Sequence, residues 1–451
     1  MNFKSNTNST RARIENILST GIKGSVRSLS LLPIIHTSSK FGIGKNISRT
    51  SLDLGNNQKP PKRTPPTRSS NSSNTSEETK SCLVMSPSKA LLEHRDKLTE
   101  YEYKEVANYP EIYFLGNAKK KYTDKFCDDR LYYKTFVGDH LAYRYEIQKL
   151  LGDGSFGIVI QCFDHKTQTP VAVKILRKGE KFAKIGEMEA GILELLNTNC
   201  EDDTIVQKLE QFKFRGHFCI VYELLSLDFY QFLKKNDFRG ISMNIIKRIA
   251  VQIIIALKHI HSASLIHCDL KPENILFKSE NKSSIKLIDF GSACEKNNKI
   301  FTYIQSRYYR APEVIIDAGY NEKIDIWGLG CILFELYKGV PIFQGINEND
   351  QLCKIVEIIG NIPENLVQLS KRRKLFFNDN GLLVNKDGVV VKPGINSVAG
   401  LIRNAEKHFI DFLLECFKLD PNDRFDAETA LMHPWIKGGK QNNSRNLRTS
   451  N

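Results

Sequence analysis

Residues 267–274, HCDLKPEN, bring together side chains that suit phosphoryl transfer. The carboxylate of Asp269 can accept the proton of a substrate hydroxyl, and the ammonium of Lys271 can neutralise charge on the phosphoryl group. Asn274 offers a hard oxygen ligand to Mg²⁺. Farther along, KLIDFGS places Asp289 after an apolar strand and before a glycine, which suits a second Mg²⁺ contact. The pattern predicts Mg²⁺-dependent phosphoryl transfer.

A glycine-rich stretch, LGDGSFGIV, is the candidate phosphate-binding loop. It consists of Leu151, Gly152, Asp153, Gly154, Ser155, Phe156, Gly157, Ile158 and Val159. Glycines let a backbone turn sharply and approach phosphates closely. The G-x-G-x-x-G spacing alone is weak evidence, because dinucleotide-binding folds share it. Here strand-like sequence stands on both sides, whereas a dinucleotide site needs a helix directly after the loop. We therefore expect a β-hairpin that covers a nucleotide.

Lys174 stands in an apolar strand, PVAVKIL. One interpretation is an edge-strand lysine that points to solvent. The functional interpretation is a lysine that reaches the phosphates of a nucleotide and is oriented by a glutamate of the next helix. That helix offers Glu187, Glu189 and Glu194. We expect Glu189, with Glu187 as the competitor, because an apolar stripe then lies on a plausible core face. The stripe consists of Ile185, Ile192, Leu193 and Leu196.

Two kinds of pattern surround these residues. From Tyr145 the chain shows apolar alternation, glycine turns and β-branched runs, which predict strands. Later in the chain we expect helices at 243–263, 322–338, 349–360, 405–418 and 426–432. A strand-rich half followed by a helix-rich half indicates an α+β protein with two lobes. Upstream, Leu91, Leu92 and Leu98 have helical spacing. We expect one more helix there, ended by Pro110.

Composition divides the 451-residue chain into four parts. Residues 1–87 are basic and rich in Ser, Asn and Thr, and we expect them to be disordered. We expect an accessory segment at 88–144, a catalytic domain at 145–436 and a disordered tail at 437–451. The net charge is +14, and residues 1–80 contribute +9 of it, with 13 Lys and Arg against 4 Asp and Glu. The rest of the chain is therefore not a strongly basic nucleic-acid binder.

Cysteine usage and hydropathy bear on the compartment. The 10 cysteines are spread singly, which argues against zinc and against the disulfide framework of a secreted protein. No apolar run is long enough for a membrane span, and the richest, at 249–260, is interrupted by Gln252 and Lys258. We expect a reducing compartment, the cytoplasm and/or the nucleus.

The motifs occur in the order glycine-rich loop, VAVK, HCDLKPEN, DFG and APE. In that order they resemble the protein kinases, and the resemblance covers residues 145–436. It implies a bilobal fold, with a five-stranded N-lobe and one main helix over a helical C-lobe, and ATP and Mg²⁺ as cofactors. It also implies an ion pair between Arg424 and Glu313. Besides Leu151 to Val159, the implied ATP-binding residues are Ala172, Lys174, the gatekeeper Tyr222 and the hinge residues Glu223 and Leu225.

Three stretches narrow the resemblance. YIQSRYYRAPEV at 303–314 is similar to the CMGC group of kinases. HCD in place of the usual HRD, and DFGSAC at 289–294, are similar to the dual-specificity tyrosine-regulated kinases, the DYRK family. NYPEIYFLGNAKK at 108–120 resembles the segment before the kinase domain in class II of that family. The homeodomain-interacting kinases, which share QSRYYRAPE, stay an alternative, and so does a pseudokinase scaffold that binds partners without chemistry.

The family resemblance also implies how the activation segment is held. The HRD arginine ordinarily binds a phosphorylated residue, and this chain has Cys268 in its place. The resemblance implies that Tyr303 is phosphorylated by the enzyme itself and gripped by Arg307 and Arg310. It implies further that the enzyme phosphorylates Ser and Thr of protein substrates. Arg310 suggests tolerance of, or a preference for, proline just after the target residue. No nucleic acid is needed by the kinase domain.

The catalytic loop and the start of the activation segment lie side by side in kinases. Cys268 and Cys294 are therefore expected to approach disulfide range. They form either a redox-sensitive pair or two buried, unreactive thiols.

Overall fold

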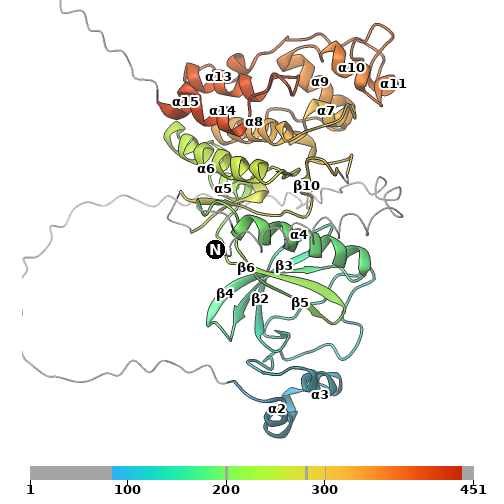
Figure 1. Cartoon of the computed structure of the whole chain (residues 1–451), viewed down its shortest axis with the longest axis vertical. Coiled ribbons are helices and arrows are strands. Elements are labelled where there is room, and N and C mark those ends of the chain that lie inside the picture. Colours follow the sequence, from blue (N-terminus) through green and yellow to red (C-terminus); the bar gives the residue numbers. More distant parts are fainter. Residues whose placement is uncertain (1–83, 199–201, 280–282, 300, 439–451) are drawn as a thin grey trace, which may run out of the picture.

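The computed structural model describes residues 84–198, 202–279, 283–299 and 301–438. It has a strand-rich N-lobe and a helical C-lobe, which confirms the predicted α+β fold (Figure 1). The predicted disorder of residues 1–87 falls almost wholly outside the described residues. Its last residues do not fit the prediction, because Met85 pairs with Ile112 and a helix begins at Pro87.

The N-lobe is built on an antiparallel sheet in the order β1-β2-β3-β4-β6-β5. Its strands are β1 (His140–Leu141), β2 (Tyr145–Gly154), β3 (Gly157–Asp164), β4 (Thr169–Leu176), β5 (Lys208–Phe214) and β6 (His217–Glu223). The resemblance implied five strands, and the sixth, β1, comes from the accessory segment. The helix α4 (Glu180–Thr198) packs against β4, β5 and β6. Gly186 permits this close approach, because a Cβ there would lie 2.5 Å from the Phe218 ring.

The C-lobe is a stack of helices. They are α5 (Phe229–Lys235), α6 (Met243–Ser262), α7 (Pro312–Ile315), α8 (Lys323–Lys338), α9 (Glu348–Ile359), α10 (Glu364–Leu369), α11 (Arg373–Phe376), α12 (Val398–Leu401), α13 (Lys407–Cys416), α14 (Ala427–Met432) and α15 (Pro434–Lys437). The five helices predicted here are present, with ends shifted by at most two residues. Helix α8 is buried on every side, which explains why its sequence is apolar all round.

Between α6 and α7 the chain forms short strands and turns of 3₁₀ helix. They are β7 (Leu265–Ile266), η4 (Pro272–Asn274), β8 (Ile275–Phe277), β9 (Ile285–Leu287), β10 (Cys294–Glu295) and η5 (Arg307–Tyr309). The motifs of the catalytic loop, DFG and the activation segment lie in and between these pieces. None of the helices in the described part of the chain combines the length and apolarity that a membrane span needs.

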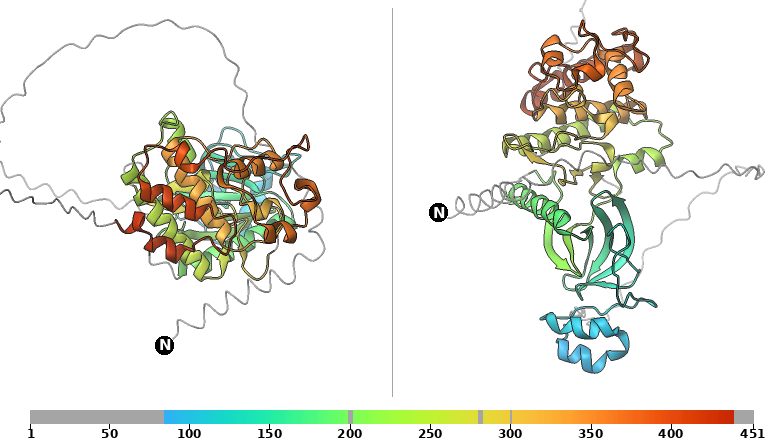
Figure 2. Two further views of the ribbon diagram at one scale, coloured as in Figure 1. Left: turned by 90° about the horizontal axis from the view of Figure 1, so that it is seen from above. Right: turned by 90° about the vertical axis from the view of Figure 1, so that its right-hand side faces the viewer.

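The accessory segment begins with two short helices at the end of the molecule far from the C-lobe (Figures 1 and 2). They are α2 (Pro87–Glu93) and α3 (Glu100–Glu105), with 3₁₀ turns η2 (Arg95–Lys97) and η3 (Val106–Asn108). The single helix predicted there is wrong. Thr99 and Glu102 form a capping box that starts a new helix, so the chain turns before it. Leu92, one of the three leucines with helical spacing, is 84% exposed.

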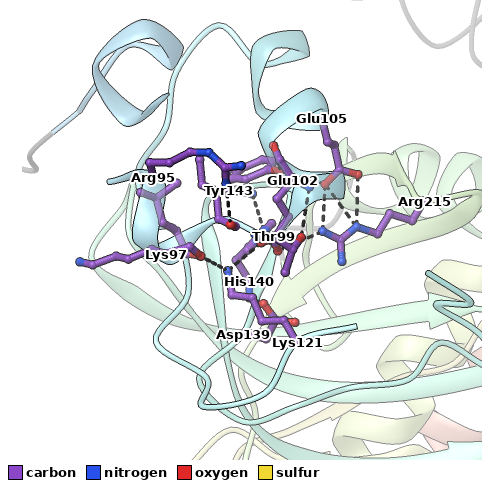
Figure 3. Close-up of polar contacts among 12 residues, drawn as sticks. Arg95, Lys97, Thr99, Glu102, Glu105, Lys121, Asp139, His140, Tyr143 and Arg215 are labelled. Carbon is purple, nitrogen blue, oxygen red and sulfur yellow. Dashed lines mark hydrogen bonds and ion pairs between the residues drawn. The ribbon is translucent and has the colours of Figure 1, made fainter. Parts of the chain in front are cut away.

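A buried polar cluster joins the accessory segment to the N-lobe sheet (Figure 3). Arg215, in the turn between β5 and β6, donates to Glu102 and to Glu105. Glu102 also accepts from Lys121 Nζ at 3.0 Å and from His140 Nε2 at 2.9 Å. Burial opposes ionisation of Glu102, but its hydrogen-bond donors lower its pKa.

The same cluster resembles a cation site at first sight. Ligand atoms of Glu102, Asp139 and His140 lie within 4.8 Å of one another. Lys121 and Arg215 already supply positive charge there, at 3.0 Å and 3.3 Å from Glu102. We therefore interpret the cluster as an internal ion network that fixes the accessory segment.

Candidate active site

Lys174 lies at the centre of the candidate site. Its Nζ donates to both oxygens of Glu189, at 2.9 and 2.7 Å, and to Asp289 Oδ1 at 2.8 Å. Strand β4 supplies the lysine, α4 the glutamate and the segment after β9 the aspartate. The competitor Glu187 lies elsewhere and pairs with Lys213 at 3.3 Å on the surface. The sequence-predicted choice of Glu189 thus agrees with the contacts.

The charges in this cluster support one another. Burial alone would lower the pKa of Lys174, but Asp289 and Glu189 raise it above its ordinary value. Burial raises the pKa of Asp289, but the Lys174 ammonium overrides this effect and lowers the pKa to about 2. Asp289 is therefore ionised at neutral pH, as a ligand of a hard cation must be.

Tyr222 makes a contact that the sequence analysis missed. Its hydroxyl donates to Glu189 Oε1 at 2.9 Å, in the buried interior between β6 and α4. Burial raises the pKa of this phenol well above its ordinary value, so the hydroxyl keeps its proton. The sequence offered a tyrosine at the expected gatekeeper position, but not which carboxylate it would reach.

The catalytic loop holds Asp269 among three donors. Lys271 Nζ lies 2.6 Å from its Oδ2, and Ser306 Oγ donates to its Oδ1 at 3.0 Å. Asn274 Nδ2 donates to its backbone oxygen at 2.8 Å. Ser306, from the activation segment, was not predicted, because nothing local in the sequence places it beside a residue so far upstream.

Asp325 of α8 fixes the backbone of the loop. It accepts hydrogen bonds from the amides of His267 and Cys268, at 2.9 and 3.1 Å, and lies 3.0 Å from His261 Nε2. Cys268 has φ of 66° and Asp289 has φ of 61°. Non-glycine residues rarely adopt this left-handed conformation, which clusters at functional sites. The surrounding hydrogen bonds stabilise the strained loop.

The glycine-rich loop is a tight hairpin. Gly154 of β2 pairs with Gly157 of β3, and only Ser155 and Phe156 lie between them. A Cβ at Gly157 would lie 2.1 Å from the Ile175 oxygen, so packing alone requires glycine there. A Cβ at Gly152 or Gly154 would meet no atom within 4 Å. The first two glycines thus leave open space, which suits the close approach of a phosphate. Other predicted members of the loop lie on its strands: Leu151, Asp153, Ile158 and Val159.

The predicted hinge follows β6. In the sheet register Ala172 of β4 pairs with Tyr222, and Val171 with Glu223. The Glu223 carboxylate accepts from the Gln207 amide at 2.8 Å and pairs with buried Lys286 of β9. Leu225, also predicted, lies just beyond the strand and is half-buried against the core.

The donor set fits the implied Mg²⁺ and nucleotide. The Ile288 amide donates to the Asn274 backbone oxygen at 3.0 Å, which brings Asn274 and the following Asp289 together. The Asn274 side-chain nitrogen is used toward Asp269, so its side-chain oxygen is the atom left for a cation. An ionised carboxylate and an amide oxygen are ligands that Mg²⁺ accepts.

The activation segment brings Tyr303 beside Arg310. The Arg310 guanidinium carbon lies 4.2 Å from the centre of the Tyr303 ring, and the tyrosine is 51% exposed. Arg310 is also paired with Glu348 at 3.0 Å. Arg307 donates from Nη1 to the Ile346 oxygen at 2.9 Å. Its buried Nε has no hydrogen-bond partner among the described residues, so it retains a donor for an anion.

Two other predicted contacts are present. Arg424 donates to both oxygens of Glu313, at 2.8 and 3.1 Å, in a fully buried ion pair. This confirms the expected brace between the APE motif and the C-lobe. The sulfur atoms of Cys268 and Cys294 lie 3.6 Å apart, and both side chains are buried.

Comparison with known proteins agrees with this geometry. The family model described as "Protein kinase domain" matches residues 145–436. The chain is 43% identical over 369 residues to "Probable serine/threonine-protein kinase dyrk2" of Dictyostelium discoideum, covering 79% of this chain and 40% of that protein. It is 41% identical over 382 residues to "Dual specificity tyrosine-phosphorylation-regulated kinase 2" of Drosophila melanogaster, covering 81% of this chain and 53% of that protein.

A third relative is matched over more of its own length. "Dual specificity tyrosine-phosphorylation-regulated kinase 3" of Homo sapiens is 41% identical over 394 residues, covering 81% of this chain and 67% of that protein. The chain therefore belongs to the protein kinases. More narrowly, it belongs to the dual-specificity tyrosine-phosphorylation-regulated kinases, the DYRK family.

Proposed function

We propose that this chain uses ATP and Mg²⁺ to phosphorylate Ser and Thr of protein substrates, and that it first phosphorylates its own Tyr303. The observation that carries the proposal is Lys174, held between Glu189 and Asp289 beside the Asp269 loop. A lysine fixed in this way is oriented for the phosphates of ATP. We assign Asn274 and Asp289 to Mg²⁺, which would neutralise phosphate charge.

The chain's own residues then divide the work. Asp269 accepts the proton of the substrate hydroxyl. Lys271, whose Nζ lies 2.6 Å from that carboxylate, neutralises the charge that develops on the transferred phosphoryl group. Burial lowers the pKa of Lys271, but Asp269 overrides the effect and raises it, so the ammonium stays charged through the reaction. Ser306 holds the other oxygen of Asp269 and so orients the base.

The backbone of Gln305 supports a preference for proline after the target residue. Gln305 has φ of 63°, and its oxygen accepts from Arg310 Nη2 at 2.7 Å. A carbonyl used in this way is not free to accept the amide of a substrate residue. An ordinary residue at that position would bury an unpaired amide, whereas proline has none.

Phosphate on Tyr303 would be held by Arg307 and Arg310. Arg310 already stacks on the ring, and the Nε of Arg307, which has no hydrogen-bond partner among the described residues, supplies a donor. Arginine forks bind phosphate bidentately, which would order the segment.

We place the boundaries of the catalytic domain at 145–436 and of the accessory segment at 88–144. We place the protein in the cytoplasm and/or the nucleus, and the free thiols of the eight described cysteines support a reducing compartment.

The proposed activity is tested with the full chain and its Asp269→Asn variant. Peptides with Ser or Thr followed by proline, or by alanine, serve as substrates with Mg²⁺ and ATP. We expect phosphorylation by the wild type alone, with the proline peptides preferred. Asp237→Asn is the matched control, because Asp237 lies on the surface with 80% of its side chain exposed. Full activity of Asp269→Asn would refute the assignment of the catalytic base.

A further inference from the structure

A small hairpin of the accessory segment, residues 126–134, lies against the N-lobe. Cys127 pairs with Tyr133, and the Lys134 amide donates to the Phe126 oxygen at 2.8 Å. Asp128 closes the turn, because its Oδ1 accepts the amides of Arg130 and Tyr132 at 2.9 and 2.8 Å. These bonds make the turn a rigid element, which we call the tip hairpin.

The tip hairpin contacts the backbone of the glycine-rich loop directly. The Tyr132 hydroxyl donates to the Gly154 oxygen at 2.8 Å. The Gly154 oxygen belongs to the second glycine of the motif. At that glycine the glycine-rich loop leaves open space for a ligand. A residue 22 positions upstream is thus tied to the part of the loop that we assign to phosphate binding.

Arg177, just beyond β4, makes a second connection between the same two elements. Its Nε donates to the Arg130 oxygen at 2.8 Å, and its Nη1 donates to the Ser155 oxygen at 3.3 Å. Its amide donates to the Phe156 oxygen at 2.9 Å. The next amide, of Lys178, donates to the Leu131 oxygen at 2.9 Å.

Ring contacts keep the Arg177 side chain in place. Its guanidinium carbon lies 5.0 Å from the centre of the Tyr132 ring and 4.6 Å from that of Phe182. The Arg130 guanidinium carbon lies 5.1 Å from the Tyr132 ring. Tyr132 therefore contributes through both its ring and its hydroxyl.

We propose that the tip hairpin positions the glycine-rich loop for the phosphates of the nucleotide, with Tyr132 and Arg177 as positioning residues. The inference rests on the proposed ATP-dependent activity. A loop with three glycines loses much conformational freedom when it closes on a ligand. Bonds that order the loop beforehand reduce that cost and so raise affinity. The accessory segment is then part of the nucleotide site, not only of the fold.

The proposed role affects binding of the nucleotide's phosphates but not binding of its adenine base. The glycine-rich loop covers phosphates, whereas the adenine belongs at the hinge around Glu223 and Leu225. Loosening the loop lowers the affinity for ATP and for ADP and leaves the affinity for adenosine unchanged. A loss of folding stability alone would lower the affinity for all three ligands equally, or would lower the fraction of protein molecules that bind ligand.

The experiment uses the full chain and Tyr132→Phe, which removes only the hydroxyl. Isothermal titration measures affinity for ATP with Mg²⁺, for ADP with Mg²⁺ and for adenosine. The loss of one hydrogen bond predicts about 2- to 10-fold weaker ATP and ADP binding. We expect unchanged affinity for adenosine. Tyr122→Phe is the matched control, because the Tyr122 ring stacks on Phe136 and its hydroxyl bonds to none of the described residues.

Arg177→Lys is the second variant, since it keeps the positive charge but loses the fork that joins Arg130 to Ser155. We expect it to lower the affinity for ATP as Tyr132→Phe does, and again to leave the affinity for adenosine unchanged. ATP affinity unchanged in both variants would overturn the inference, and so would an equal loss for ATP and adenosine. A wild-type chain that binds no ATP would overturn the proposed function as well, and the wild-type titration alone identifies that outcome.

Discussion

The Tyr222 hydroxyl and the Lys174 ammonium share one carboxylate, that of Glu189. The hydroxyl donates to Oε1 at 2.9 Å, and the ammonium lies 2.9 and 2.7 Å from the two oxygens. Burial raises the pKa of Glu189, and Lys174 opposes that rise. A buried carboxylate needs several donors to stay in place, and β6 and β4 supply them jointly to α4.

Tyr222→Phe tests the contribution of this hydroxyl. Lys174 still pairs with Glu189 in the variant, but one buried donor is lost and α4 is held less firmly. We expect kcat to fall about 2- to 10-fold and the free energy of unfolding to fall by about 1–2 kcal/mol. Peptide phosphorylation and urea unfolding measure the two effects. Tyr145→Phe, which loses a hydroxyl bonded to Glu210 at 3.1 Å, is the control and should keep its kcat. Equal kcat in all three proteins would contradict the account.

Glu189→Gln and Glu187→Gln form a second matched pair, because they lie on one helix and lose the same charge. Glu189 is buried against Lys174, whereas Glu187 pairs with Lys213 at 3.3 Å on the surface. Glu189→Gln is expected to lower kcat/KM by on the order of 10- to 100-fold, because Lys174 loses the partner that orients it. Glu187→Gln is expected to stay within twofold, since exposed pairs contribute about 0–1 kcal/mol. The reverse order in a peptide assay would show that the wrong glutamate was assigned.

Glu335 gives the protein a pH-dependent stability. The Tyr309 hydroxyl donates to it at 2.7 Å, and burial raises its pKa from 4.5 to about 7. The carboxyl is neutral in both states at low pH. As pH rises from 4.5 to 7, the unfolded chain ionises first, so the folded state loses up to about 3 kcal/mol from this group.

Glu335→Gln is expected to remove that loss. The difference in unfolding free energy between the variant and the wild type should move in the variant's favour from pH 5 to pH 8, because other titrating groups cancel in the difference. Urea unfolding at several pH values measures it. A difference that does not change with pH would mean that Glu335 is already ionised in the folded protein.

Cys268 and Cys294 are close enough to test as a redox pair. Their sulfur atoms, 3.6 Å apart, need only a small movement to reach a bond of about 2 Å. Hydrogen bonding to Cys268 lowers the pKa of Cys294, which favours its thiolate. Hydrogen peroxide would take two electrons from the two thiols, which form one disulfide, and would leave as two waters.

We expect peroxide to reduce wild-type activity reversibly, with recovery on addition of dithiothreitol, and to spare Cys294→Ser. Intact-mass measurement should show a loss of two hydrogens in the wild type and not in Cys294→Ser. Cys353→Ser is the control, because that cysteine lies on α9 away from the catalytic loop. Equal loss of activity in the wild type and in Cys294→Ser would show that Cys268 and Cys294 are two unreactive thiols and not a redox pair.

The site was predictable where chemistry depends on short motifs. Asp269, Lys271 and Asn274 lie on one loop, and Lys174 in β4 and Asp289 after β9 each stand in a short motif that indicates their role. Partners brought together by folding had no such signal. Ser306, Tyr132 and Arg215 act on residues far away in sequence, and their roles follow only from how the elements pack.

The accessory segment shows a signal that was present but not used. Thr99 and Glu102 have the spacing of a capping box, which marks a helix start. The leucine spacing around it was interpreted as one continuous helix. Local capping chemistry prevailed over periodicity there, because two satisfied backbone donors stabilise a new helix start.

The central claim is that phosphorylation of Tyr303 depends on the chain's own Asp269. Phosphosite mass spectrometry on the full chain made in bacteria, beside its Asp269→Asn variant, tests this directly. We predict near-complete phosphate on Tyr303 in the wild type and none in the variant. Phosphate on Tyr303 in both proteins, or an unmodified Tyr303 in a wild type that still phosphorylates Ser and Thr, would contradict the account.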